Sequence, residues 1–247
     1  MPIDPKTLDD AFTALAAYDW GKDAGPLAPL DAAVVAAHGD PALRADLEKR
    51  LAALLGTGAS RAAKDQACRR LSLVATAASV PAAAALLSDA DNSHMGRFVL
   101  ERIGGPEACA ALRKALETTK GALKLGMISS LADLRDAEAV KPLAGLLGGE
   151  EPVAVAAARG LGRIGTPEAL AALVAAAPSA AAGVGPAIAD SRLTCAETLL
   201  AAGNRTEAKA AYQALVEAVR GKPESKAVAM AATRGVLACA DPSAAAN

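Results

Sequence analysis

The chain has 247 residues, of which 53% are hydrophobic and 21% are charged, and its formal net charge at pH 7 is −1. It is too apolar for a disordered chain, and it has no overall basic excess of the kind that drives binding to nucleic acid. Alanine and leucine dominate the apolar residues, whereas the whole chain holds only two Phe, two Tyr and one Trp. Because strands depend on β-branched and aromatic residues while Ala and Leu favour helices, we expect an all-α fold.

The first 40 residues are expected to form a capping pair of helices, over 7–18 and 27–38. Three of the chain's few aromatic residues, Phe12, Tyr18 and Trp20, lie close together in this segment. A terminal repeat has to cover the apolar face of its neighbour, and large rings do this well. We therefore interpret the three rings as capping residues rather than as a binding site.

Three later segments align without gaps and define a repeat. LERIGGPEACAAL begins at Leu100, LADLRDAEAVKPL at Leu131 and LGRIGTPEALAAL at Leu161, so the period is close to 30 residues. In the third copy Gly165 can end one helix, and Thr166 followed by proline is a natural start for the next. Each unit is therefore helix, tight turn, helix, and this period is typical of a solenoid.

The same signals along the whole chain predict about seven antiparallel helix pairs in a single domain, 1–247. After the N-terminal cap, 1–40, we expect regular repeats over 41–203 and a divergent C-terminal repeat with a tail over 204–247. The pairs expected after the cap are 41–55 with 60–76, 80–88 with 94–103, 106–118 with 121–134, 137–147 with 152–164, 167–177 with 184–202, and 205–219 with 225–239.

The segment from Glu150 to Ala177, EEPVAVAAARGLGRIGTPEALAALVAAA, resembles the short bacterial HEAT repeat of the phycobilisome-lyase type. The residues 64–87 and 94–103 also resemble HEAT modules of exported bacterial proteins, some of which carry a domain of the 3-keto-disaccharide hydrolase type. The resemblance implies a HEAT-like superhelix in which the second helix of each pair lines a concave face. Residues 204–215 are similar instead to a tetratricopeptide pattern.

Motifs for chemistry are weak. Gly160, Gly162 and Gly165 spell G-x-G-x-x-G, but no strand pattern precedes them, so we interpret them as helix packing and a helix stop rather than a nucleotide site. The two histidines, His38 and His94, belong to no metal-binding pattern, and the four cysteines are scattered. We expect no catalytic residues, no cofactor and no metal.

Charge is the most informative signal. The six expected second helices from residue 60 onwards carry a formal charge of +7, so the rest of the chain must carry −8. Two interpretations stay open: a positive groove that binds a partner, or arginines that brace the repeats. The candidate concave binding surface consists of Arg61, Lys64, Arg69, Arg97, Phe98, Arg102, Arg159 and Arg163.

These features favour a non-catalytic scaffold that binds another protein, with an acidic protein or other polyanion as the expected partner. Alternatives are an accessory or spacer module of a carbohydrate-processing system and a HEAT-like nucleic-acid enzyme, which would need more aromatic rings in its groove. No apolar run is long enough to span a membrane. We expect a soluble chain, either cytoplasmic or exported after loss of a signal peptide, and the sequence leaves the oligomeric state open.

Overall fold

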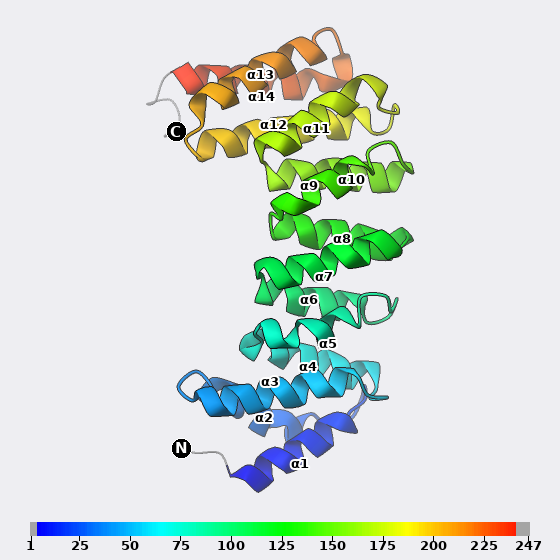
Figure 1. Cartoon of the computed structure of the whole chain (residues 1–247), viewed down its shortest axis with the longest axis vertical. Helices are drawn as coiled ribbons and strands as arrows, with labels where there is room; N and C mark the ends of the chain where they lie inside the picture. Colours follow the sequence, from blue (N-terminus) through cyan, green and yellow to red (C-terminus); the bar gives the residue numbers. More distant parts are fainter. Residues whose placement is uncertain (1–3, 241–247) are drawn as a thin grey trace. The chain divides into compact units, whose positions relative to one another are not determined.

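The computed structural model describes residues 4–240 apart from the side chain of Glu224; the last part of the predicted C-terminal tail, 241–247, lies outside these residues. Within this range the chain forms fourteen α-helices and five short 3-10 helices, with no strand (Figure 1). The all-α fold predicted from composition is therefore confirmed, and the fourteen helices correspond in order to the seven predicted pairs.

Most of the helix boundaries follow the predicted ones closely. The earlier α-helices are α1 (Pro5–Ala16), α2 (Ala28–Ala36), α3 (Pro41–Leu55), α4 (Arg61–Val74), α5 (Val80–Ala84), α6 (Ser93–Ile103) and α7 (Gly105–Thr118). The later ones are α8 (Gly121–Asp133), α9 (Val140–Ala144), α10 (Glu151–Ile164), α11 (Pro167–Ala176), α12 (Gly185–Ala201), α13 (Arg205–Val219) and α14 (Lys226–Ala240). The 3-10 helices are η1 (Gly25–Leu27), η2 (Ala77–Ser79), η3 (Ala137–Ala139), η4 (Ala177–Ser179) and η5 (Pro223–Ser225).

The chain divides within α8 into two compact units, one ending at Met127 and the other beginning at Ile128. In the first unit the second helices α2, α4 and α6 pack on one another in order, and so do the first helices α3, α5 and α7. In the second unit α10, α12 and α14 form one layer, while α9 and α11 form the other. Each unit is thus a two-layered stack of helix pairs, the arrangement of an α-solenoid.

The predicted repeat is visible in the core. The aligned leucines at the start of each copy, Leu100, Leu131 and Leu161, have no exposed surface. The same holds at two further positions of the alignment, which are occupied by Ala108, Ala139 and Ala169 and by Leu112, Leu143 and Leu173. These three sets of positions are buried to the same extent, which supports the register of the three copies, although at a fourth aligned position Ile164 is buried and Ile103 and Leu134 are only partly buried.

The predicted helix starts and stops are also confirmed. The Asp40 carboxylate accepts hydrogen bonds of 3.0 Å from the backbone amides of Ala42 and Leu43 at the start of α3. The Thr166 hydroxyl accepts one of 3.2 Å from the amide of Ala169 at the start of α11. Gly165 ends α10 in the left-handed conformation, with φ of 70°. Local sequence is sufficient to place these ends, because each cap uses only residues of its own turn.

Two predicted first helices are shorter than expected. The segments 80–88 and 137–147 contain α-helices of five residues each, α5 and α9, and each follows a 3-10 helix. After α5 the amides of Leu86 and Leu87 bond to carbonyls three residues earlier, at 3.2 and 3.0 Å, in place of the α-helical four. This tighter winding places both leucines in the core.

The N-terminal aromatic residues behave in two ways. Phe12 and Tyr18 are buried, and the Arg50 guanidinium lies 3.9 Å above the Phe12 ring. Trp20, in contrast, is 63% exposed, so its ring covers no apolar face of the repeats. Two of the three rings are therefore buried, as the capping interpretation requires, whereas Trp20 does not fit it and lies beyond the end of α1 in a turn.

Candidate functional site

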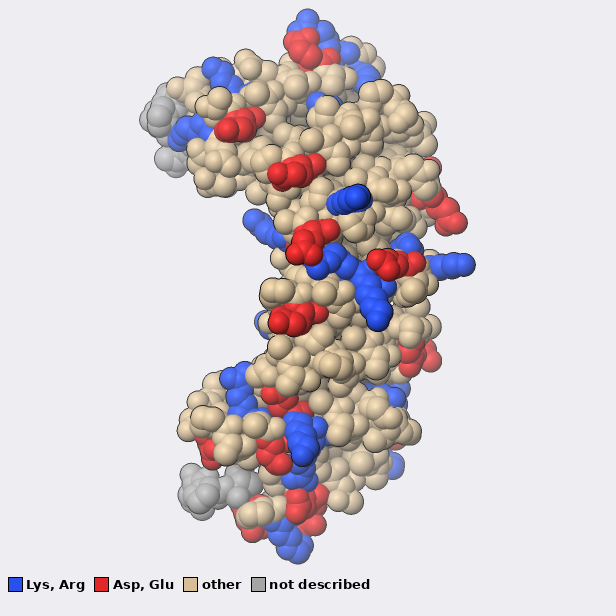
Figure 2. Space-filling view, viewed as in Figure 1, with Lys and Arg blue, Asp and Glu red and all other residues tan. Residues whose placement is uncertain are grey.

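The predicted surface residues lie on three second helices. Arg61, Lys64 and Arg69 are on α4 and Arg97, Phe98 and Arg102 are on α6, all in the first unit, whereas Arg159 and Arg163 are on α10 in the second unit. The two groups are described separately below. On the face shown in Figure 2, Lys and Arg side chains alternate with Asp and Glu in both units and form no patch of one sign.

In the first unit, α4 and α6 pack against each other and enclose a hollow of about 250 Å³ on their surface. Its floor consists of Cys68 and Met95, which are buried, and its rim includes the exposed Phe98 and His94. We call this the α4–α6 hollow; its lining residues are Asp65, Cys68, Arg69, His94, Met95 and Phe98. Two predicted residues, Arg69 and Phe98, therefore meet at one place.

Basic side chains at the hollow are only partly free to attract a partner. The Arg69 guanidinium donates a 2.8 Å hydrogen bond to the Asp65 carboxylate one turn earlier, and this bond with the attraction of the charges raises the pKa of Arg69. The Arg102 guanidinium lies 5.8 Å from the centre of the Phe98 ring, within the range of a cation–π interaction. Phe98 is 38% exposed, so a partner can still reach its ring.

Arg97 has a structural role. Its guanidinium donates a 3.4 Å hydrogen bond to the Gly126 carbonyl on α8, and it lies 3.8 Å from the Glu101 carboxylate on its own helix. A Cβ at Gly126 would lie 2.7 Å from the Arg97 Nε atom, so the glycine leaves the space that the arginine side chain fills. Arg97 thus braces α6 against α8, as the structural interpretation predicts.

Arg163 and Arg159 differ from each other on α10. Arg163 forms an ion pair with Asp133 at the end of α8, so it too links successive second helices. Arg159 is exposed and takes part in no hydrogen bond or ion pair among residues 4–240. Of the two, Arg159 is the better candidate for contact with a partner.

A buried arginine outside the predicted set, Arg70, shows most clearly that an arginine can join two second helices. Arg70 on α4 donates a 3.0 Å hydrogen bond to the Asp31 carboxylate on α2 and a 2.7 Å bond to the side chain of Gln66. It is 7% exposed. Like Arg163 and Asp133, Arg70 and Asp31 connect one second helix to the next, so part of the positive charge of the second helices serves to join repeats.

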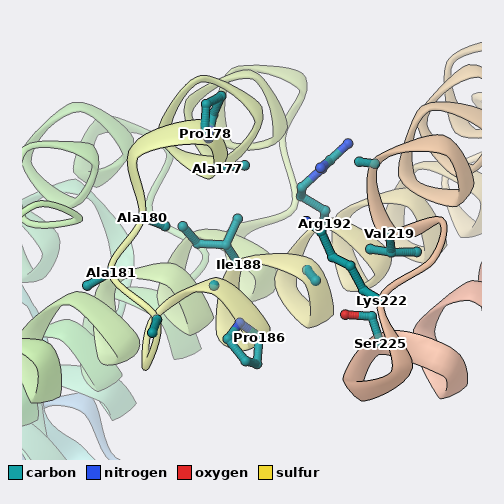
Figure 3. A pocket seen from close by; sticks show the side chains of 14 residues that line it. Ala177, Pro178, Ala180, Ala181, Pro186, Ile188, Arg192, Val219, Lys222 and Ser225 are labelled. Carbon is teal, nitrogen blue, oxygen red and sulfur yellow. The ribbon is translucent and has the colours of Figure 1, made fainter.

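The second unit holds a pocket that the sequence analysis missed. Its volume is about 450 Å³, and it lies between η4, the start of α12, the end of α13 and η5 (Figure 3). Arg192 of α12 lines this pocket, is only 6% exposed, and has no hydrogen-bond partner for its Nε atom in the described chain. Burial lowers the pKa of its guanidinium. The sequence does indicate that Arg192 is buried. Ile188 is four residues before it and Cys195 three residues after it, so all three lie on one apolar face of the helix.

The described residues show neither of two other kinds of site. Among residues 4–240, no group of three or more His, Cys, Asp or Glu side chains is arranged to hold a metal ion. In the same range, no helix combines the length and the apolar character needed to cross a membrane. The His38 ring lies at the end of α2, with Nδ1 3.2 Å from the Val35 carbonyl oxygen.

Comparisons with known proteins agree with the repeat. Residues 153–177 match the family model of the PBS lyase HEAT-like repeat, inside the segment whose sequence resembles that family. A comparison with curated proteins finds no match.

Two solved structures of engineered proteins from a structural genomics consortium are similar to this chain. The first is 21% identical with a TM-score of 0.41, and the alignment covers 78% of this chain and 97% of the other. The second is 19% identical with a TM-score of 0.42, and the coverage is 92% of this chain and 67% of the other.

Proposed function

We propose that the chain is a non-catalytic scaffold that binds an acidic segment of a partner protein through exposed faces of its second helices. The observation that carries this proposal is Phe98 at the α4–α6 hollow, an exposed ring that shares the lining with Arg69 and the buried Cys68 and Met95 and lies 5.8 Å from the Arg102 guanidinium. Aromatic residues and arginine, placed beside a hollow, are the usual anchors of protein interfaces.

The chemistry of the hollow specifies the segment. Cys68 and Met95 form a floor that suits one apolar side chain, while Arg69 lines the hollow and Arg102 lies beside the Phe98 ring. Arg61 and Lys64 lie one to two turns before Arg69 on α4, and their side chains form no hydrogen bond or ion pair among residues 4–240. An apolar residue flanked by Asp or Glu therefore fits best.

An accessory or spacer module of a carbohydrate-processing system is the alternative. A spacer needs the stacked repeats but no contact at the hollow, so substitutions there would leave its behaviour unchanged. The two proposals therefore differ in one measurable respect, the effect of Phe98 and Arg69 on retention of a partner.

The experiment compares partner capture by four forms of the chain from extract of the source cells. These are the unsubstituted chain, Phe98→Ala, Arg69→Ala and the control Lys49→Ala, which removes an exposed positive charge from the opposite layer of the same unit. We expect a protein that is retained by the unsubstituted chain and by Lys49→Ala but lost from the other two. Circular dichroism establishes that each variant is folded. Equal retention by all four forms would contradict binding at the hollow and favour the spacer.

A further inference from the structure

Arg192 is a buried positive charge. It is 6% exposed, and among residues 4–240, apart from the Glu224 side chain, its own side chain forms no hydrogen bond or ion pair. Burying a charge without a partner is costly, and arginine keeps its proton at neutral pH. The other buried arginine of a second helix, Arg70, shows the usual solution, since it bonds to Asp31 and Gln66. The described residues of the second unit provide no such partner for Arg192.

Most of the wall of the pocket beside Arg192 is apolar. Alanines of the α11–α12 connection, Pro178, Pro186, Ile188 and Val219 form most of its wall, and its volume is about 450 Å³. In Figure 3 the Arg192 side chain extends into the space between the turn that holds Pro178 and the end of α13 that holds Val219. The guanidinium is therefore presented to a cavity large enough for a small molecule.

Further features of the wall favour a negative group. The Ser225 hydroxyl lines the pocket and forms no hydrogen bond within the described chain, and the exposed Lys222 lies beside it. The helices α12 and α14 begin at this pocket, at Gly185 and directly after Ser225. Helix starts carry partial positive charge, so they add to the attraction of Arg192.

We propose that this pocket is a binding site for a small aliphatic carboxylate, with the carboxylate on Arg192 and the hydrocarbon chain against the alanines, Ile188 and Val219. The planar guanidinium matches a carboxylate with two parallel hydrogen bonds. Arg192, Ser225 and Lys222 supply the polar part of the lining, whereas most of the remaining wall is apolar and suits a hydrocarbon chain. A monocarboxylate with a short hydrocarbon chain therefore fits better than a phosphate.

This site is independent of the α4–α6 hollow, because it lies in the other unit and uses other residues. Its failure would leave the proposed binding of an acidic segment intact, and the reverse also holds.

The test is isothermal titration calorimetry of the full chain with straight-chain carboxylates from propanoate to octanoate, the matching amides and inorganic phosphate. We expect one carboxylate bound per chain, with affinity that rises with chain length until the pocket is full. The amides, which carry no charge, should bind about tenfold more weakly or worse.

Three variants assign the binding to the pocket. Arg192→Met should lower the affinity about tenfold or more and leave the melting temperature equal or higher, because it removes an unpaired buried charge at similar volume. Ala181→Phe keeps the charge but fills the cavity from an exposed lining position, so it should reject the longer acids. Arg234→Met, an exposed arginine of α14 away from the pocket, should bind like the unsubstituted chain.

Four results would overturn the proposal. They are an unchanged affinity in Arg192→Met, amides that bind as tightly as acids, phosphate that binds more tightly than every carboxylate, and a folded chain that binds none of the acids at millimolar concentration.

Discussion

The buried Glu48 carboxylate on α3 accepts a 2.7 Å hydrogen bond from the hydroxyl of Ser79, which has no exposed surface. It accepts two more from Thr76, at 2.7 Å from the backbone amide and 2.8 Å from the hydroxyl. Thr76 and Ser79 belong to the connection between α4 and α5, which leads from one helix pair to the next. One carboxylate therefore fixes the junction between two repeats.

Ser79→Ala should lower the free energy of unfolding by about 1.5–3 kcal/mol, because it removes a hydrogen bond to a buried charge. Urea unfolding followed by circular dichroism measures this. Ser72→Ala is the matched control, since the Ser72 hydroxyl bonds only to the Arg69 carbonyl in its own helix. The control should change stability by less than about 0.5 kcal/mol. Equal effects of the two substitutions would show that the Glu48 bond contributes nothing.

The same carboxylate predicts a dependence of stability on pH. Desolvation alone raises the pKa of Glu48, but the hydrogen bonds from Ser79 and Thr76 and the charge of Arg44 together lower it below its ordinary 4.5. A lowered pKa means that the ionised form stabilises the fold above the unfolded-state value, and this contribution is lost as pH falls through the folded-state pKa.

Glu48→Gln provides the comparison for that prediction. The difference in unfolding free energy between the unsubstituted chain and Glu48→Gln should be largest near neutral pH and should shrink as the pH is lowered below 4.5. Urea titrations at a series of pH values measure it. A difference that stays constant from neutral to acid pH would contradict an ionised Glu48 in the folded chain.

The interpretation of the G-x-G-x-x-G glycines as packing residues predicts that a side chain at Gly162 destabilises the fold. A Cβ at Gly162 would lie 2.9 Å from the Ser191 Cβ atom and 3.0 Å from its Cα atom, because α10 and α12 approach closely there. Gly162→Ala should therefore lower the free energy of unfolding by about 1–3 kcal/mol, although alanine favours a helix more than glycine does.

Gly148→Ala is the control for this substitution, because a Cβ there would meet no atom within 4 Å. Thermal unfolding of both variants separates close packing from chain entropy. If Gly162→Ala is as stable as Gly148→Ala, the packing interpretation of these glycines fails.

Features set by neighbouring residues in the sequence could be predicted. The caps at Asp40 and Thr166 and the left-handed Gly165 each depend on one turn, and the sequence analysis placed them correctly. The core leucines of the three copies followed from the period alone, because a repeated unit buries equivalent positions.

Features set by distant residues could not be predicted in the same way. The sequence analysis placed Arg97 and Arg163 on the candidate binding surface and left a bracing role open, because their partners Gly126 and Asp133 lie 29 and 30 residues away in the sequence. The sequence analysis used Arg192 only when it summed the charge of its helix. Ile188, four residues earlier, and Cys195, three residues later, nevertheless indicate that Arg192 lies on a buried helix face. A solvent-exposed arginine and a bracing arginine look alike in a charge count.

The cysteines provide a test of burial. Desolvation raises the pKa of the Cys68 and Cys195 thiols to about 12, so each is almost wholly protonated at neutral pH. Cys239 is only partly buried. Iodoacetamide followed by mass spectrometry should therefore label Cys239 first in the folded chain and label Cys68 and Cys195 only after unfolding. Rapid labelling of Cys195 in the native chain would mean that the contact between α10 and α12 opens readily.

The two arginines of α10 provide the last test, because their surroundings differ although their positions in the sequence analysis were equivalent. Arg163→Ala removes an ion pair that is exposed to solvent and should lower the free energy of unfolding by at most about 1 kcal/mol. Arg159→Ala removes a charge with no ion pair in the described chain and should leave stability unchanged.

If this part of α10 contacts an acidic partner, the two substitutions should affect binding in the opposite order to their effects on stability. Arg159→Ala should then weaken the affinity more than Arg163→Ala, because Arg163 is already paired with Asp133. Affinity for a captured partner should also fall as salt rises, since exposed charges more than about 10 Å apart are largely screened at 0.1 M. Adding Asp133→Ala to Arg163→Ala checks the assignment, because the double variant removes the ion pair without leaving Asp133 as an unpaired negative charge. Binding that ignores salt and both arginines would identify the charge on α10 as a consequence of how the repeats are joined, with no part in contact with a partner.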